Sequence, residues 1–199
     1  MRISLSTPKA VKYACLKFHY AKSVPVTKYS FNVFNDNGEW CGVILYGSGA
    51  NNHIADPFEL YQGEVLELVR VALNGKQKTT SQAVALTLRE LRKIAPHIKI
   101  VVSYADQRQK HLGIIYQATN WFYVGESITS DMQYLLNGKW THERSINARK
   151  NKDLLKSTLP KRENSNKHKY VFCLCKKQRK KWKKRSKEYP KRNDSNKSN

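Results

Sequence analysis

We predict an α/β domain over residues 6–126 because helix-like and strand-like patterns alternate along this part of the chain. The chain has 199 residues, of which 40% are hydrophobic and 11% aromatic, a composition that can form a core and argues against wholesale disorder. Residues 98–104 form a nearly continuous apolar run. Such a run is typical of a central strand that is covered on both faces.

The first predicted element is a helix that begins at Ser6-Thr7-Pro8 and continues to about Tyr20. A hydroxyl cap followed by proline favours a helix start, and apolar residues then recur at helical spacing. Residues 29–34 and 40–46 have strand-like patterns on either side of the turn sequence Asn35-Asp36-Asn37-Gly38. This arrangement predicts a β-hairpin.

The pattern then predicts a third strand, a long helix and three shorter elements. Thr79, Thr80 and Ser81 provide hydroxyl caps for the long helix, and Pro96 follows its last apolar residue. The predicted order is therefore α β β β α β α β. The later elements are a strand at 64–73, a helix at 79–94, a strand at 98–104, a short helix at 109–118 and a strand at 121–124.

The charge of the chain is concentrated at its C-terminal end. Lys and Arg total 37 against 15 Asp and Glu, a net charge of +22, of which 21 basic and 4 acidic residues lie in 144–199. This end carries +17 and residues 1–143 carry +5, an imbalance that indicates a polyanionic partner. The residues expected to contact nucleic acid are Lys176, Lys177, Arg179, Lys180, Lys181, Trp182, Lys183, Lys184 and Arg185.

Interleaved aromatic side chains such as Trp182 and Tyr189 are expected to stack on exposed bases. The alternative interpretation of this segment is a basic targeting or solubilising tail. The longest apolar runs are too short to span a membrane, and no signal-peptide pattern is visible at the N-terminus. The four cysteines are too scattered for a disulfide scaffold, so we expect a soluble cytosolic protein.

The segment Asn74–Ser81 combines a flexible turn, two cations and three hydroxyl groups at the start of the long helix. Unpaired N–H groups at a helix N-terminus favour a phosphate or pyrophosphate group. The alternative is a solvated, well-capped loop. The candidate binding residues are Lys76, Gln77, Thr80 and Ser81.

Two charged residues occur in or directly after apolar strands. Arg70 is placed by strand alternation on the face of Leu66 and Leu68, where a buried guanidinium needs an anionic partner. Asp106 follows the central strand, where α/β sheets commonly form sites. The alternative for Asp106 is a structural salt bridge to Arg108 or His111.

Histidine and tyrosine side chains provide further candidates for acid-base or metal-binding roles. His19 and Tyr20 end the first helix, whereas Tyr104 and Tyr116 lie in the second half of the domain. The alternative for His19 is a helix-capping or surface residue.

Four segments taken together resemble the Mom DNA-modification proteins of Mu-like bacteriophages. Each segment alone is a weak signal, but the four in this order are specific, and the likeness extends over most of residues 10–146. The segments are Ile44–Asn51, Glu67–Arg70, Val102–Asp106 and Gly113–Trp121.

The resemblance implies a divergent GNAT acyltransferase fold, in which helices flank a mixed central sheet. On this basis we expect a catalytic domain at 1–143 and a basic DNA-binding extension at 144–199, whose end is disordered. The implied partner is double-stranded or locally opened DNA in the cytoplasm of the bacterial host. The oligomeric state stays open, with a homodimer as one alternative.

The activity implied by the resemblance is modification of the exocyclic amine of adenine in DNA. The product is methylcarbamoyl (acetamido) adenine, which protects phage DNA from host restriction enzymes. Acetyl-CoA or a related donor is expected at residues 74–81, although this segment lacks the glycine-rich Q/R-x-x-G-x-G/A pattern. Direct acyl transfer would give N-acetyladenine, so the family's product requires chemistry beyond simple acyl transfer.

The resemblance also implies residue roles. Arg70, Asp106, Tyr104 and Tyr116 are the expected catalytic residues. Iron is associated with the family, and His19, Tyr20 and Asp106 are its expected ligands because imidazole, phenolate and carboxylate groups suit iron. The alternative functions are acetyl-CoA-dependent N-acetylation of a protein or small amine, and non-catalytic DNA binding on a GNAT scaffold.

Overall fold

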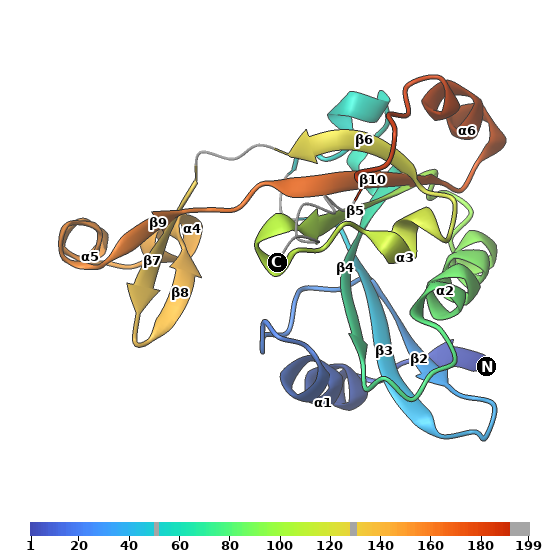
Figure 1. Cartoon of the computed structure of the whole chain (residues 1–199), viewed down its shortest axis with the longest axis horizontal. Coiled ribbons are helices and arrows are strands. Elements are labelled where there is room, and N and C mark those ends of the chain that lie inside the picture. The colour runs from blue at the N-terminus through green and yellow to red at the C-terminus, as the bar shows by residue number, and fades with distance from the viewer. Residues whose placement is uncertain (50–51, 128–130, 192–199) are drawn as a thin grey trace, which may run out of the picture.

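The computed structural model describes residues 1–49, 52–127 and 131–191. Its larger part is a seven-stranded sheet with the order β1-β2-β3-β4-β5-β10-β6 (Figure 1). Neighbouring strands are antiparallel except β4 and β5, which are parallel. These strands are β1 (Arg2–Leu5), β2 (Tyr29–Phe34), β3 (Trp40–Gly47), β4 (Val65–Leu73), β5 (Ile100–Asp106), β6 (Phe122–Ser127) and β10 (Lys167–Cys173).

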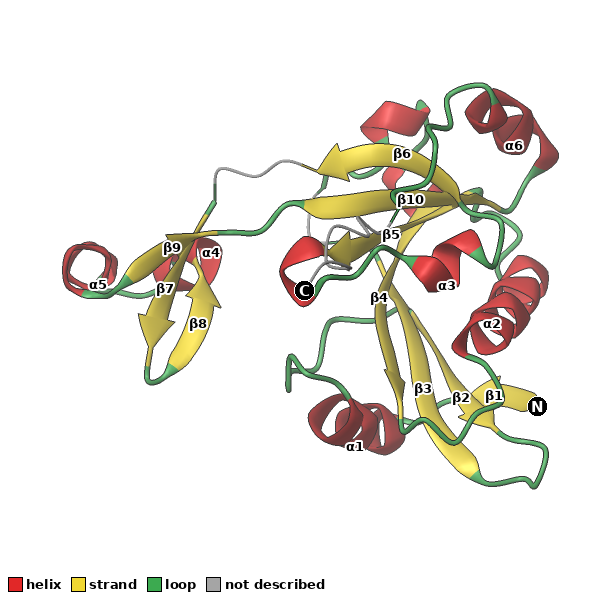
Figure 2. Ribbon diagram, in the orientation of Figure 1, coloured by secondary structure: helices red, strands yellow, loops and turns green. Residues whose placement is uncertain are grey.

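Two helices flank this sheet, one on each face (Figure 2). The side chain of Thr7 accepts a hydrogen bond at the start of α1 (Pro8–Phe18), and Thr79 does the same at α2 (Thr80–Ile94). The predicted starts of both helices are therefore confirmed, with the same capping residues. Shorter helices are α3 (Ile114–Gln117), α6 (Lys176–Lys183), η1 (Asp56–Phe58), η2 (Gln62–Glu64) and η3 (Gln107–Gln109).

Alternating residues of β3 form the core on both faces of the sheet. Ile44 packs in the α2 layer, whereas Val43 and Leu45 pack in the α1 layer, and all three are fully buried. The predicted hairpin β2–β3 is confirmed, with its turn at Asn35–Gly38. Strand β1 was not predicted because its four residues are mostly exposed and lack a clear apolar alternation.

The predicted helix at 109–118 is wrong in its extent. The chain instead forms η3, a short connection at 110–113, and then α3. Gly113 separates the two because it adopts φ +71°, a left-handed conformation that glycine tolerates. Its Cα also lies so close to Tyr170 that a Cβ would be 2.4 Å from the ring.

Strands β4 and β5 diverge after three paired residues. Val65, Leu66 and Glu67 pair with residues 100–102, and β4 then continues beside β3 while β5 continues beside β10. The pairing of β3 with β4 shifts register at Val69, where β4 contains one extra residue. This bulge and the divergence of the two strands open a cleft in the middle of the sheet.

A second, three-stranded sheet lies between β6 and β10 in the sequence and projects away from the large sheet in Figure 1. Its strand order is β8-β7-β9, and α4 packs against β7 and β8. We call residues 132–163 the small module. Its elements are β7 (Met132–Leu136), β8 (Lys139–His142), α4 (Glu143–Asn147), α5 (Lys152–Thr158) and β9 (Lys161–Glu163).

The large sheet contains strands from both sides of the predicted domain boundary at 143/144. Strand β10 lies between β5 and β6, and Tyr170 and Val171 are fully buried there. The predicted boundary therefore crosses the unit that this sheet forms. The end of the chain expected to be disordered, 192–199, lies outside the described residues. Within the described ranges, no helix is long and apolar enough to cross a membrane.

Candidate active site

The cleft between β4 and β5 has a volume of about 740 Å³ and collects most of the predicted site residues. They come from the end of α1, from β4 and β5, from the start of α2 and from α3. This convergence could not be read from their positions in the sequence. The predicted residues that line the cleft are His19, Tyr20, Arg70, Gln77, Thr80, Tyr104, Asp106 and Tyr116.

Arg70 faces the α1 side of the sheet, so its predicted placement on the face of Leu66 and Leu68 is wrong. The bulge at Val69 reverses the alternation of the residues that follow it in β4. Val71, rather than Arg70, packs in the same layer as Leu66 and Leu68. The guanidinium Nη1 lies 2.7 Å from Nδ1 of His19. Since a guanidinium can only donate, Nδ1 of His19 accepts, and its ring proton is on Nε2.

The guanidinium of Arg70 is only partly satisfied by protein groups. Its Nε is buried and has no hydrogen-bond partner among the described residues. Burial lowers the pKa of Arg70, while Cys15, Tyr20 and Glu67 act in the opposite direction. A charged donor that faces a cleft in this way is suited to contact an anionic or developing negative oxygen of a ligand.

His19 is held neutral in the folded protein. Burial and then the charges of Arg70, His111 and Lys22 lower its pKa to about 4. Its Nδ1 also accepts the backbone N–H of Ala21 at 3.1 Å, just beyond the end of α1. The interpretation of His19 as a local capping residue is therefore confirmed, and the same nitrogen also positions Arg70.

We expect His19 to make the folded protein less stable at mildly acidic pH. The unfolded chain binds a proton near pH 6.5 and the folded chain only near pH 4, so stability is lost as pH falls through this range. The loss in free energy of unfolding is about 1–2 kcal/mol after allowance for solvent screening.

Urea unfolding at pH 7, 5.5 and 4.5 measures this effect, with His19→Asn as the control. Asparagine retains an acceptor near Nδ1 but does not titrate. The variant is expected to lack this part of the pH dependence, and an identical dependence in both proteins would contradict the assignment.

The three predicted iron ligands, His19, Tyr20 and Asp106, all line the cleft. In this arrangement Nδ1 of His19 accepts two N–H groups and Nε2 carries the proton, so iron binding would require the imidazole to exchange one of these partners. The residues that the structure describes contain no group of three His, Cys, Asp or Glu side chains able to hold a metal. Iron binding by His19, Tyr20 and Asp106, a set that includes a phenol, is not supported by this finding and stays a prediction.

Asp106 ends β5 at the edge of the cleft. Its Oδ1 accepts the backbone N–H of Arg108 at 2.9 Å and the hydroxyl of Ser165 at 2.5 Å. The predicted salt bridge to Arg108 or His111 is replaced by these two hydrogen bonds. Both fix the carboxylate through one oxygen, which leaves Oδ2 for a ligand in the cleft.

Tyr104 and Tyr116 provide protonated phenols to the cleft. Burial raises the pKa of each to about 12, so both keep their protons at neutral pH. Ser103 donates its single hydroxyl proton to the carbonyl of Leu68 on the neighbouring strand at 3.0 Å, so the Tyr116 hydroxyl, 2.8 Å away, donates to the Ser103 oxygen. Ser103 thus connects the two diverging strands where the cleft opens, and the Tyr116 proton is directed to Ser103.

Two of the four predicted donor-binding residues line the cleft. Gln77 donates to the hydroxyl of Thr80 at 3.0 Å, beside the N-terminus of α2, and the Oε1 of Gln77 is buried without a partner among the described residues. Ser81 instead contacts Thr79 within the first turn of the helix. An α-helix N-terminus with a buried polar atom beside it suits the phosphate and amide groups of a CoA-type donor.

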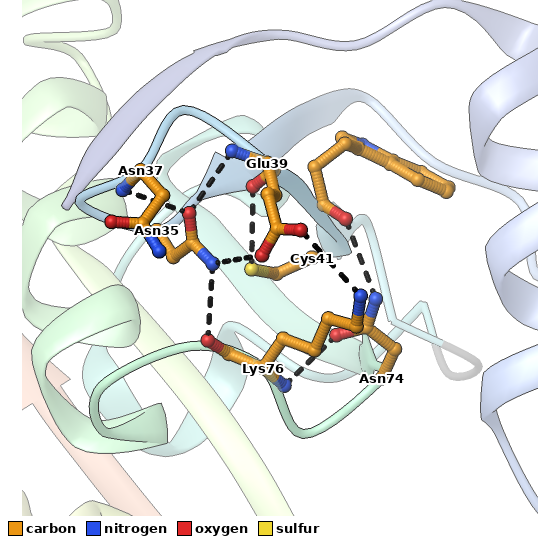
Figure 3. Close-up of polar contacts among 7 residues, drawn as sticks. Asn35, Asn37, Glu39, Cys41, Asn74 and Lys76 are labelled. Atoms are coloured by element: carbon orange, nitrogen blue, oxygen red, sulfur yellow. Dashed lines mark hydrogen bonds and ion pairs between the residues drawn. The ribbon is translucent and has the colours of Figure 1, made fainter.

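Lys76 lies against the β2–β3 turn, and its predicted contact with a donor is not supported by its position (Figure 3). Its Nζ lies 3.6 Å from Oε1 of Glu39, and its carbonyl accepts from Asn35. Asn74 donates to the carbonyl of Trp40 in the same cluster. These contacts attach the β4–α2 connection to the hairpin, so Lys76 positions Gln77 and Thr80.

Helix α6 carries the predicted DNA-binding block and packs against the large sheet. Trp182 is buried and lies 5.0 Å from the ring of Phe58, so the prediction that it stacks on bases is wrong. Lys181 pairs with Glu59 at 2.8 Å, and the remaining basic side chains of the block are exposed. Tyr189 donates to the carbonyl of Trp121 at 2.7 Å. DNA contact by the exposed cations stays a prediction.

The packing of α6 predicts that Trp182→Ala destabilises the whole protein. Loss of this buried indole is expected to lower the free energy of unfolding by about 3–5 kcal/mol. Lys180→Ala on the exposed face of the same helix is the matched control, with an expected change within about 0.5 kcal/mol. Urea unfolding measures both, and equal small effects would show that α6 is peripheral to the fold.

Glu67 and Lys167 also line the cleft, although sequence reasoning did not select them. Simple strand alternation places Glu67 and Arg70 on opposite faces of β4, and the bulge at Val69 brings the two to the same cleft. Lys167 lies within the basic C-terminal segment, where nothing local distinguishes it from other lysines. Its position follows only from the pairing of β10 with β5.

The fold is that of the GNAT acetyltransferases. A Bacillus subtilis acetyltransferase in complex with CoA superimposes with a TM-score of 0.50 at 12% identity, covering 87% of this chain and 99% of that chain. A Vibrio cholerae spermidine/spermine N-acetyltransferase gives a TM-score of 0.50 at 8% identity, covering 90% and 95%.

The sequence assigns the chain to one family within this fold. The sequence model of the Mom protein family matches residues 1–191, and the chain belongs to that family. The methylcarbamoylase mom of Escherichia phage Mu is 33% identical over 85 residues. This match covers 42% of the chain and 34% of the phage Mu protein, so it spans about a third of that relative's length.

Proposed function

We propose that this protein is a phage DNA-modifying transferase that adds a methylcarbamoyl group to the exocyclic amine of adenine. The observation that carries the proposal is the family match, combined with a cleft that collects Arg70, Asp106, Tyr104 and Tyr116 between diverging strands. The net charge of +22 supports DNA as the substrate. The modified DNA would resist host restriction enzymes in the cytoplasm of the infected bacterium.

The proposed roles follow from the geometry of the cleft. Gln77, Thr80 and the N-terminus of α2 would hold acetyl-CoA or a related donor. Acetyl-CoA would supply only the two-carbon unit, so a methylcarbamoyl product would also need a nitrogen-containing co-reactant and an oxidant that activates the methyl carbon, or a donor that already carries the amide. Arg70 is positioned by His19 to contact negative charge, and Asp106 has a carboxylate oxygen available to receive a proton from the amine. Tyr116 and Tyr104 stay protonated, and Tyr104 can donate to a leaving group.

DNA modification requires access to an amine that is base-paired inside the duplex. A cleft of about 740 Å³ is large enough for a nucleotide-sized ligand, but a paired base cannot enter it. The target adenine must therefore be extruded or single-stranded, at a cost of a few kcal/mol. Exposed cations of α6 would hold the DNA with little sequence preference.

Nucleoside mass spectrometry on plasmid DNA from cells that express the protein tests the proposal. We expect a new adenosine species heavier by one acetamido substituent, absent from cells with an empty vector. Unmodified DNA from cells with soluble, folded protein would contradict the proposal.

A second candidate is acetyl-CoA-dependent N-acetylation of a protein or small amine, favoured by the acetyltransferase fold of the structural neighbours. Purified protein with acetyl-CoA and an amine would then release free CoA, measured as thiol, and give an N-acetylated amine by mass spectrometry. The two candidates are separated by the mass and identity of the product.

A further inference from the structure

A second cavity of about 600 Å³ lies where β10, the diverging end of β4 and β5, and the small module meet. It opens beside the cleft already described, and its wall combines apolar and basic side chains with polar ones and with the carboxylates of Glu67 and Asp131. Pockets of this size accommodate ligands as large as a nucleotide. The wall residues that matter for the argument are Ile54, Pro57, Tyr104, Arg144, Lys167 and Lys169.

Two lysines of β10 give this cavity its charge. Lys167 and Lys169 both line it, whereas His168 between them contacts the Tyr123 hydroxyl at 3.0 Å. The Lys169 ammonium lies 5.6 Å from the centre of the Phe58 ring, and burial lowers its pKa. Within residues 1–49, 52–127 and 131–191, neither ammonium group forms an ion pair or a hydrogen bond.

Partly buried ammonium groups that form no direct ion pair are unfavourable, even with the carboxylates of Glu67 and Asp131 elsewhere on the same wall. An anion that enters the cavity would relieve this cost for both lysines together. A phosphate has several acceptor oxygens, so it can contact two ammonium groups at once. Arg144 of α4, on the small module, adds a third cation to the lining.

The remaining wall of the cavity suits a planar, apolar ligand group. Ile54 is buried and Tyr104 is largely covered, and Pro57 lies with them along the same cavity. Aromatic and apolar side chains of this kind stack on a nucleobase that has left its duplex. The cations suit the phosphate of a nucleotide and the apolar wall suits its base, so the cavity matches a single nucleotide in chemistry.

The two cavities share part of their walls. Glu67, Tyr104 and Lys167 line both, and Asp106 borders the first. A base bound in the second cavity would therefore have one edge at the boundary with the cleft where the donor is expected. Because the two cavities adjoin, a nucleotide in the second cavity could meet a donor bound in the cleft while both stay bound to the protein.

We propose that this second cavity binds the target nucleotide of DNA, with Lys167 and Lys169 contacting its phosphate and Tyr104 contacting its base. This inference rests on the proposed function, which supplies DNA as the substrate. The small module forms one wall of the site and presents Arg144 to it.

Binding of 2′-deoxyadenosine 5′-monophosphate and of deoxyadenosine to the purified full-length protein tests the inference by calorimetry. We expect the monophosphate to bind at least tenfold more tightly, because its phosphate adds charge-assisted hydrogen bonds. The double variant Lys167→Gln/Lys169→Gln is expected to lose this preference. Lys169→Arg retains a cation and is expected to keep most of it.

Lys139→Gln is the matched control, because this exposed lysine of the small module does not line the cavity. Lys167→Gln alone guards against misfolding, since Lys167 has no ring contact comparable to that of Lys169 with Phe58. Equal binding of nucleoside and monophosphate by the wild type would overturn the inference. Equal weakening by Lys139→Gln would do the same, because it would indicate general charge attraction.

The same variants separate this inference from the proposed function. If plasmid DNA is modified equally by wild type and Lys167→Gln/Lys169→Gln, the nucleotide site is wrong while the proposed function stands. If plasmid DNA is unmodified but the monophosphate preference depends on the two lysines, the site is correct and the proposed function is wrong.

Discussion

Arg70→Met is expected to reduce adenine modification at least a hundredfold without destabilising the fold. The side chain keeps its length but loses the charge that faces the cleft. Removing one preorganised donor to developing negative charge typically lowers rates by about 10²–10³. The measurement is the fraction of modified adenosine in plasmid DNA at equal levels of folded protein.

The stability of the same variant distinguishes a functional from a structural role. The Arg70 guanidinium is partly buried, and its Nε lacks a partner among the described residues, so its removal relieves a desolvation cost. We therefore expect the free energy of unfolding to stay unchanged or to rise. A loss of several kcal/mol together with activity would instead assign Arg70 a structural role.

Arg70→Lys provides a matched control for charge. Lysine keeps the positive charge but replaces the planar fork by a single ammonium, so it cannot contact His19 and a ligand in the same way. We expect this variant to remain largely inactive. Full activity would show that charge alone is required at this position.

Local signals explain why most of the main fold was predictable. Thr7 and Thr79 cap helices whose apolar spacing follows directly in the sequence, and Asn35–Gly38 form the expected turn. These features depend on residues that are close together in the chain. Their order also agreed with the family resemblance, which supplied the GNAT fold.

Long-range pairing explains what was missed. Strand β10 pairs with β5 and β6, and the small module separates it from β6 in the sequence. Its lysine-rich surroundings gave it the appearance of a solvated tail, although Tyr170 and Val171 complete the core. The burial of Trp182 was hidden by the same basic composition.

The site was predictable by residue type more than by arrangement. The orientation of Arg70 depends on a single extra residue at Val69, and a bulge of this kind has no sequence signature here. Likewise, Lys76 appeared to be a ligand-binding cation, but it contacts Glu39 on a hairpin that is distant in the sequence. In both cases the contact is decided by register between strands.

Asp106→Asn is the second substitution with a large expected effect. Formation of a bond to the exocyclic nitrogen of adenine requires that nitrogen to lose a proton, and a carboxylate at the cleft edge can accept it. Loss of a positioned general base lowers rates by about 10²–10⁴, so we expect modification to fall by that factor. Nucleoside mass spectrometry and urea unfolding provide the two readouts.

Asparagine is chosen because it preserves the structural contacts of Asp106. Its amide oxygen can still accept from the N–H of Arg108 and the hydroxyl of Ser165, so the end of β5 and the start of η3 should remain in place. Ser165→Ala removes one of these contacts but keeps the carboxylate, and a much smaller loss is expected. An Asp106→Asn protein that modifies adenine as well as wild type would eliminate the carboxylate as the base. Another group in the cleft would then have to accept the proton, and Glu67 is the other carboxylate among the described residues that line it.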